Sequence, residues 1–263
     1  MEVAILPTPE DCARVVADVL AAAVTAGSPG DRPTLGLATG SSPVLSYREL
    51  IRRHREEGLS FAGVRAFLLD EYVGLPGDHP ESYRSVIRRE LTSHVDIADS
   101  DVDSPDGAHP DPLVAAREYE QRLREGGPVA VQLLGIGANG HIGFNEPGSS
   151  LSSVTRVKTL TEQTRQDNAR FFASPDDVPH HVITQGLGTI GRAQHLLLTA
   201  SGPHKAAAVA AAVEGPLTAS CPASVLQLHP HATVVVDEAA AAQLERADYY
   251  RYTLRHKLPH QPY

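Results

Sequence analysis

The chain alternates between short apolar runs and longer segments in which apolar residues recur at helical spacing. The short runs predict strands at 34–38, 64–69, 129–134, 156–160, 195–199 and 233–236. The segments with helical spacing predict helices at 9–23, 43–57, 82–91, 112–125, 164–172, 205–213 and 239–246. Thr8 followed by Pro9, and Asp111 followed by Pro112, are typical of helix starts, and Gly126-Gly127 of a helix end.

This alternation predicts an α/β fold with a mostly parallel sheet and helices on both faces. We find no linker or low-complexity break, so residues 1–263 are expected to form a single domain. In such sheets, ligands bind beyond the carboxyl ends of the strands. The segments that follow four of the predicted strands should therefore meet at one edge: 39–42, 70–72, 135–146 and 201–202.

The run from Gly135 to Pro147 is the richest in chemistry, since it holds four glycines, a histidine, two amides and a carboxylate. Gly135, Gly137 and Gly140 also match the G-x-G-x-x-G dinucleotide fingerprint. That fingerprint should open a helix, yet Gly143 and Pro147 disfavour one. No acidic residue stands where the ribose partner belongs, so a nicotinamide cofactor is disfavoured.

His141 and Glu146 lie five residues apart in this flexible run. A carboxylate hydrogen-bonded to one imidazole nitrogen would leave the other nitrogen free for proton transfer. The alternative is a loop histidine with a local structural hydrogen bond. Asp70 directly follows an apolar strand, where partial desolvation suits a general base, although a turn cap is equally open. Glu71 and Tyr72 should point elsewhere if the backbone stays extended.

The loop Thr39-Gly40-Ser41-Ser42 joins a predicted strand to a predicted helix. Hydroxyls and backbone N–H groups at a helix start can bind an anion, although an ordinary helix cap explains the same residues. Arg170 and Lys205 are each ordinary surface charges when taken alone. Together with this loop, they make a plausible phosphate clamp.

The chain has a net charge of −9, which disfavours a nucleic-acid partner. Its two cysteines, Cys12 and Cys221, favour the cytoplasm over a disulfide-bonded class. The sequence shows no membrane-length apolar run and no signal-peptide pattern, so no membrane association is expected. The histidines at 180–181 and 229–231 lack Cys or carboxylate partners at ligand spacing, so no metal is expected.

Several runs resemble the glucosamine-6-phosphate deaminase (glucosamine-6-phosphate isomerase) family across nearly the whole chain. They are residues 69–75, 79–83, 140–151, 156–161, 168–172 and 226–230. The resemblance implies a single-domain Rossmann-like fold. It also implies an enzyme that converts glucosamine 6-phosphate and water to fructose 6-phosphate and ammonia in amino-sugar catabolism. No metal or redox cofactor is implied.

By the same resemblance, Asp70 moves the proton between C2 and C1, His141 opens the sugar ring, and Glu146 is the carboxylate partner of His141. The implied phosphate-binding residues are Thr39, Gly40, Ser41, Ser42, Arg170 and Lys205. The best-known relatives carry Asp two residues before the histidine, whereas this chain has Asn139, as other members do. An amide orients the imidazole but stabilises its cation less than a carboxylate does.

Some members of the family are hexamers activated by N-acetylglucosamine 6-phosphate. Ser149, Arg156 and Lys158 match residues of that allosteric site, so the resemblance implies a homo-oligomer, up to a hexamer, with allosteric activation. Two rival functions stay open. A 6-phosphogluconolactonase shares the fold but lacks the Phe-Asn-Glu-Pro and Asp-Glu-Tyr-Val-Gly-Leu runs, and a non-enzymatic sugar-phosphate sensor would bind without turnover.

Overall fold

The computed structural model describes residues 1–26, 32–258 and 263. Its main sheet has seven strands in the order β1-β10-β9-β6-β2-β3-β5, and every neighbouring pair is parallel. These strands are β1 (Glu2–Leu6), β10 (Ala232–Asp237), β9 (His195–Ala200), β6 (Val131–Leu134), β2 (Thr34–Leu37), β3 (Arg65–Leu68) and β5 (Val102–Asp103). The predicted α/β class with a mostly parallel sheet is confirmed.

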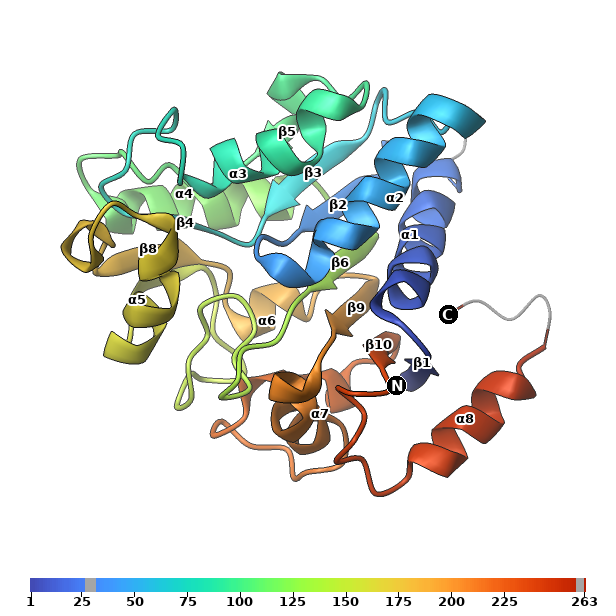
Figure 1. The fold of residues 1–263 in the computed structure, drawn as a ribbon. Coiled ribbons are helices and arrows are strands. Elements are labelled where there is room, and N and C mark those ends of the chain that lie inside the picture. Colours follow the sequence, from blue (N-terminus) through green and yellow to red (C-terminus); the bar gives the residue numbers. More distant parts are fainter. Residues whose placement is uncertain (27–31, 259–262) are drawn as a thin grey trace.

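A second, antiparallel sheet has the order β4-β8-β7. It is formed by β4 (Asp70–Tyr72), β8 (His181–Thr184) and β7 (Arg156–Thr159). β4 begins two residues after β3 ends, so the chain passes directly from the main sheet into the small one. Figure 1 shows β8 and α5 grouped at one side of the molecule, away from α1, α2 and α8.

The helices connect the strands and flank the main sheet. They are α1 (Pro9–Thr25), α2 (Ser41–Glu57), α3 (Tyr83–Glu90), α4 (Pro112–Glu125), α5 (Glu162–Asn168), α6 (Leu187–Ile190), α7 (Ala206–Val213) and α8 (Ala247–Arg255). The predicted helix starts at Thr8 and Asp111 are confirmed, because both side chains accept hydrogen bonds from the backbone of the first turn. α1 and α2 lie side by side over the main sheet (Figure 1).

Buried aliphatic residues on the strands form one continuous core with the inward faces of the helices. All residues of β2, β6, β9 and β10 are buried, as expected for parallel strands covered on both faces. Among the described residues, no helix is both long and apolar enough to cross a bilayer.

The predicted helix at 239–246 is wrong. The segment forms turns, and the helix begins only at Ala247. Two carboxylates capture its backbone donors: Asp237 accepts from the N–H of Ala240, and Glu214 accepts from the N–H groups of Glu245 and Arg246. The alanine-rich sequence favours a helix locally, but these tertiary hydrogen bonds replace the helical ones.

Candidate functional site

The four segments expected to meet at one edge of the sheet do so. β9, β6, β2 and β3 are consecutive neighbours and run in parallel, so their carboxyl ends share one edge. Lys205, after β9, donates from Nζ to the carbonyl oxygen of Ile136, after β6, at 2.6 Å. A Cβ built on Gly143 would lie 3.5 Å from Oδ2 of Asp70, which follows β3.

A polar pocket opens where α2 begins. Its volume is about 180 Å³, and its polar lining comprises Ser41, Ser42, Ser46, Thr199, Ser201, His204 and Lys205. Gly40 precedes α2 with φ at 98°, a backbone conformation that favours glycine, and no side chain caps the helix. The first N–H groups of α2 therefore remain available for an anion.

The predicted phosphate-binding residues are only partly brought together. Ser41, Ser42 and Lys205 line the pocket, whereas Thr39, Gly40 and Arg170 are absent from its lining. Arg170 lies in the short 3₁₀ turn Ala169–Phe171 after α5, and its guanidinium packs 4.7 Å from the ring centre of Phe171. Burial, with a smaller contribution from the Arg170 charge, lowers the pKa of Lys205, so the two cations share one neighbourhood.

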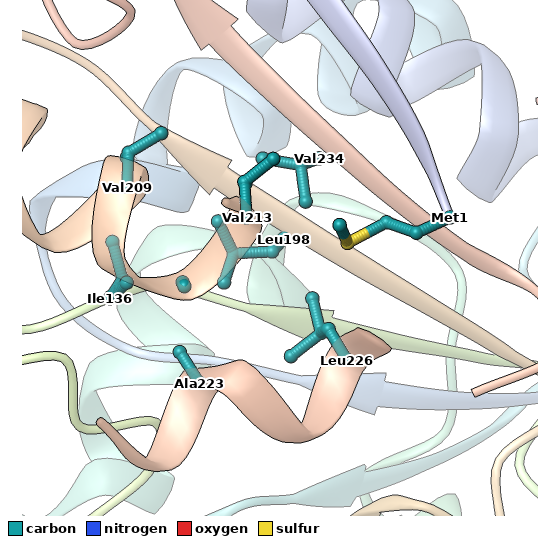
Figure 2. A pocket seen from close by; sticks show the side chains of 9 residues that line it. Met1, Ile136, Leu198, Val209, Val213, Ala223, Leu226 and Val234 are labelled. Atoms are coloured by element: carbon teal, nitrogen blue, oxygen red, sulfur yellow. The ribbon is translucent and has the colours of Figure 1, made fainter. Parts of the chain in front are cut away.

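A second, apolar hollow lies near the polar pocket and differs from it in its lining. Figure 2 shows Ile136, Leu198, Val209 and Val213 around it, with Met1 reaching in from the amino end of the chain. The hollow has no space for a water molecule, and its lining is entirely apolar. It belongs to the core beneath α7, and it is Ile136 that connects it to Lys205 through the backbone carbonyl.

His141 is joined to Glu146 through an amide. The Asn139 Oδ1 atom lies 2.7 Å from His141 Nδ1, and Asn139 Nδ2 donates to Glu146 Oε2 at 2.7 Å. The carboxylate itself lies 3.6 Å from His141 Nδ1, beyond direct hydrogen-bond distance. An amide oxygen can only accept, so Nδ1 carries the proton and Nε2 of the neutral ring is free to accept one.

Glu146 is buried and has the surroundings of a permanently ionised carboxylate. Its Oε1 accepts from the Thr164 hydroxyl at 2.5 Å, and its Oε2 accepts from Asn139. Burial alone would raise the pKa of Glu146, but the His141 imidazole and the donors Thr164 and Asn139 together lower it to about 2. The Glu146 carboxylate therefore orients the Asn139 amide, and this amide orients the His141 imidazole.

The glycines of this loop allow the histidine to be packed closely. A Cβ on Gly137 would lie 2.2 Å from the His141 ring, so no other residue fits there without moving the imidazole. Gly140 has φ at 83°, and a Cβ there would lie 2.7 Å from Cys221 Sγ. The glycines of the G-x-G-x-x-G run thus form a tight turn around His141, and residues 141–147, which follow the run, are not helical.

Asp70 is buried, and no hydrogen bond to its carboxylate occurs within the described residues. Burial, together with the neighbouring Glu71, raises its pKa well above the ordinary value of 3.8. Glu71 points elsewhere, as expected for an extended backbone. It accepts from the N–H groups of Tyr72, Tyr83 and Arg84 and so anchors the start of α3.

Phe144 connects the His141 ring to a cluster of aromatic rings that includes Tyr72 of β4. Phe144 lies 6.5 Å from the His141 ring, 6.3 Å from Tyr72 and 5.9 Å from Tyr83, measured between ring centres. Phe172 packs edge-on against Tyr72 at 5.6 Å. Asp70 lies two residues before Tyr72 in β4, and its burial is the main cause of its raised pKa.

Two of the three residues matched to an allosteric site adjoin the loop that carries His141: Arg156 contacts it, and Ser149 follows it in sequence. Arg156 in β7 donates from Nη1 to Asn145 Oδ1 at 2.8 Å, and burial lowers its pKa. Lys158, two residues further along β7, is half-buried. Ser149 is buried, and its hydroxyl has no hydrogen-bond partner within the described part of the chain.

Sequence reasoning missed three residues of this region: Thr164, Asn145 and His204. Thr164 and Asn145 bond to Glu146 and Arg156 respectively, and His204 lines the polar pocket. Two of them had a sequence signal: Asn145 is one of the two amides in the run Gly135 to Pro147, and His204 precedes Lys205 in the segment after a predicted strand. Over residues 1–26, 32–258 and 263, no group of three or more His, Cys, Asp or Glu side chains is arranged to hold a metal ion.

Comparison with known proteins identifies similar chains. The family model for glucosamine-6-phosphate isomerases/6-phosphogluconolactonase matches residues 7–236. A glucosamine-6-phosphate deaminase of Rhodococcus jostii (strain RHA1) is 62% identical over 257 residues, which cover 98% of each chain. The corresponding protein of Corynebacterium kroppenstedtii is 60% identical over 263 residues, the full length of both chains.

A solved structure described as a monomeric glucosamine-6-phosphate deaminase, a missing link of the NagB superfamily, is also similar. It is 43% identical with a TM-score of 0.89, covering 92% of this chain and 100% of that chain. A 6-phosphogluconolactonase from Trypanosoma brucei has a TM-score of 0.72 at 22% identity, covering 92% of this chain and 98% of that chain. At that identity, the second likeness concerns the fold alone.

Proposed function

The chain belongs to the glucosamine-6-phosphate isomerase/6-phosphogluconolactonase family, and we propose that it is the deaminase. It converts glucosamine 6-phosphate and water to fructose 6-phosphate and ammonia. The observation that carries this proposal is the meeting, at one sheet edge, of a buried carboxylate of raised pKa and a histidine held in one tautomer. An isomerisation with proton transfer between adjacent carbons requires a base and an acid–base group of these kinds.

In the proposed reaction, the 6-phosphate binds at the start of α2 with Ser41, Ser42 and Lys205. Thr39, Gly40 and Arg170 complete this anchor. The free helix N–H groups and a half-buried ammonium suit a dianionic group. Arg170, outside the pocket in the structure, would reach the phosphate from the turn after α5.

His141 then transfers a proton between the C1 hydroxyl and the ring oxygen through Nε2, and the pyranose ring opens. Asn139 holds the imidazole and Glu146 holds Asn139. Asp70 removes the proton from C2 to give an enolamine and returns it to C1, which leaves an imine at C2. Water adds to the imine, the C2–N bond breaks, and ammonia leaves.

The raised pKa of Asp70 supports its assignment as the base. A carboxylate that is short of donors and shielded from water binds a proton more tightly than an exposed one. Abstraction of a C–H proton requires such a base, whereas opening a lactone with water does not require proton transfer between C2 and C1. Asp70 therefore favours the deaminase over the 6-phosphogluconolactonase.

The test measures ammonia and fructose 6-phosphate released from glucosamine 6-phosphate by the purified protein. We expect the two products in equal amounts. Equal amounts of protein are also assayed with 6-phosphogluconolactone. Hydrolysis of the lactone without ammonia release from the amino sugar would assign the rival function, and binding of the sugar phosphate without turnover of either compound would identify a sensor.

We further propose that Ser149, Arg156 and Lys158 bind N-acetylglucosamine 6-phosphate in a homo-oligomer, up to a hexamer. The half-buried Arg156 cation bonds to a neutral amide rather than to a carboxylate, and the Ser149 hydroxyl lacks a partner within the described residues. Light scattering with and without the effector measures the assembly. Sigmoidal kinetics that become hyperbolic with the effector support this proposal, and hyperbolic kinetics indifferent to it contradict it.

We also propose a cytoplasmic location and no membrane or nucleic-acid partner. The two cysteines, Cys12 and Cys221, are unpaired and buried, as suits a reducing compartment. The net charge of −9 opposes binding to phosphate backbones. Cell fractionation followed by immunodetection tests the location.

A further inference from the structure

We infer that the Thr164 hydroxyl is a positioning group that connects the phosphate-binding segment of the chain to the His141 relay. This inference rests on the proposed function and concerns how its two halves communicate. Thr164 lies in α5, is buried, and donates from Oγ1 to Glu146 Oε1 at 2.5 Å. No step of the proposed reaction uses this contact directly.

The Thr164 hydroxyl is itself held by a chain of hydrogen bonds. The N–H of Thr164 donates to Thr161 Oγ1 at 3.1 Å, and Thr161 Oγ1 donates to Thr164 Oγ1 at 2.9 Å. Thr164 Oγ1 then has its proton directed at Glu146. Each donor in such a chain polarises the next, so the start of α5 presents one preoriented donor to the carboxylate.

Glu146 has few other means of keeping its position. Oε1 accepts only from Thr164 within the described residues, and Oε2 accepts from Asn139 Nδ2. Asn139 in turn fixes His141 Nδ1. The orientation of the Glu146 carboxylate therefore fixes the plane of the Asn139 amide. The orientation of that amide in turn fixes the direction in which Nε2 of His141 points.

The same short segment carries the phosphate contact. α5 ends at Asn168 and passes directly into the turn Ala169–Phe171 that holds Arg170. Asn168 Nδ2 donates to the Tyr72 hydroxyl at 3.0 Å, which ties the segment to β4 beside Asp70. Residues 162–171 thus contact both β4 and Glu146, and they carry Arg170, which we propose to bind the phosphate.

This arrangement makes phosphate binding a positioning event for catalysis. When Arg170 engages the 6-phosphate, the segment is fixed in the position in which Thr164 already donates to Glu146. Binding energy from the non-reacting phosphate is then used to orient the reacting groups, so its effect appears in kcat as well as in KM.

The test compares Thr164→Val with Thr164→Ser. Val keeps the shape of Thr without the hydroxyl, whereas Ser keeps the hydroxyl. With glucosamine 6-phosphate, we expect T164V to lower kcat about tenfold, the effect of losing one hydrogen bond to a charged group, with KM nearly unchanged. T164S should keep kcat within about threefold of wild type. Unchanged kcat in T164V, or loss of kcat in T164S, would overturn the inference.

Thr161→Val serves as a structural control. It removes the side-chain cap of α5 but leaves Thr164 able to donate to Glu146. Thermal melts of all variants confirm folding at the assay temperature. We expect T161V to lower kcat less than T164V does. An equal loss in both would assign the effect to the helix rather than to the Thr164 hydroxyl, contrary to the inference.

A double-mutant cycle with Arg170→Gln tests the connection to the phosphate. If Arg170 and Thr164 act through one segment, T164V should cost less in kcat/KM when Arg170 is already replaced. Additive losses would contradict this connection. Failure of the wild-type protein to release ammonia would overturn the proposed function instead, so the two failures are distinguishable.

Discussion

Asp70 and Glu146 are two buried carboxylates at one edge of the sheet, and their surroundings are opposite. Glu146 receives hydrogen bonds from Asn139 and Thr164, and its pKa falls to about 2. Asp70 receives none within the described residues, lies beside Glu71, and has a raised pKa. The same functional group thus becomes a fixed anion in one place and a proton-binding base in the other.

The difference shows how the site divides its tasks. Groups whose environments drive their pKa values apart are suited to different steps of acid–base chemistry. Donors aimed at Glu146 stabilise its charge, so it can orient His141 through Asn139 without taking a proton. Burial removes solvent from Asp70 and Glu71 lies beside it, so its affinity for a proton is high.

The largest effect is expected from Asp70→Asn. Loss of the base should lower turnover of glucosamine 6-phosphate by about 10²–10⁴-fold, measured as ammonia release. The variant should bind the sugar phosphate with little change, because Asp70 lies apart from the pocket at α2. Near-normal turnover would remove Asp70 from the mechanism.

The same substitution should stabilise the fold at neutral pH. A raised folded-state pKa means that the stability contributed by protonated Asp70 is present below pH 3.8 and is lost as pH rises through the folded-state pKa. Asn removes the buried charge, so the melting temperature at pH 7.5 should rise by about 2–4 °C, the shift that ~1 kcal/mol gives. A lower melting temperature in D70N would contradict the account of its surroundings.

Glu146→Gln should have the opposite effect on stability. The lowered pKa of Glu146 means that its contribution is present above pH 4.5 and is lost as pH falls toward about 2. We expect E146Q to cost about 1.5–3 kcal/mol at pH 7.5, measured by urea unfolding, since the hydrogen bonds lose their charge. The difference in free energy of unfolding between wild type and E146Q should become smaller in acid. A difference that stays constant with pH would show that the Glu146 charge is not its cause.

The smallest effect is expected from Asn139→Asp, which changes the link between Glu146 and His141. A carboxylate beside the imidazole stabilises the imidazolium, so the acidic limb of the pH–rate profile should move upward. The measurement is kcat/KM from pH 5 to pH 9 with Asn139→Ala as a control that supplies neither charge nor orientation. If the acidic limb of the pH–rate profile is the same in N139D as in wild type, this explanation is wrong.

Residues near one another in sequence were the easiest to interpret. Asn139, His141 and Glu146 share one loop, and Ser41 and Ser42 open one helix, so their meeting follows from local chain geometry. The expected direct bond from Glu146 to His141 was replaced by one through Asn139, because the amide lies between them. A spacing of five residues cannot distinguish the two arrangements.

The small antiparallel sheet was the hardest part to predict. β4 and β8 are three and four residues long, and they pair across more than a hundred positions of sequence. Short strands carry little periodic signal, and their pairing depends on contacts between segments far apart in sequence. The prediction of a helix at 239–246 was wrong for a related reason. Glu214, far from this segment in sequence, accepts hydrogen bonds from the backbone N–H groups of Glu245 and Arg246.

The order of the strands, and the strands β1 and β5, came from the structure. The sequence was enough to predict the parallel α/β class and the meeting of four loops at one sheet edge, because apolar periodicity is a local property of the chain. It also identified which residue types carry the chemistry. The structure was needed to show that Glu146 has two donors, one of them Thr164, while Asp70 has none among the residues described. Burial and hydrogen-bond partners come from segments far apart in sequence, and these long-range neighbours set the charge and direction of each group.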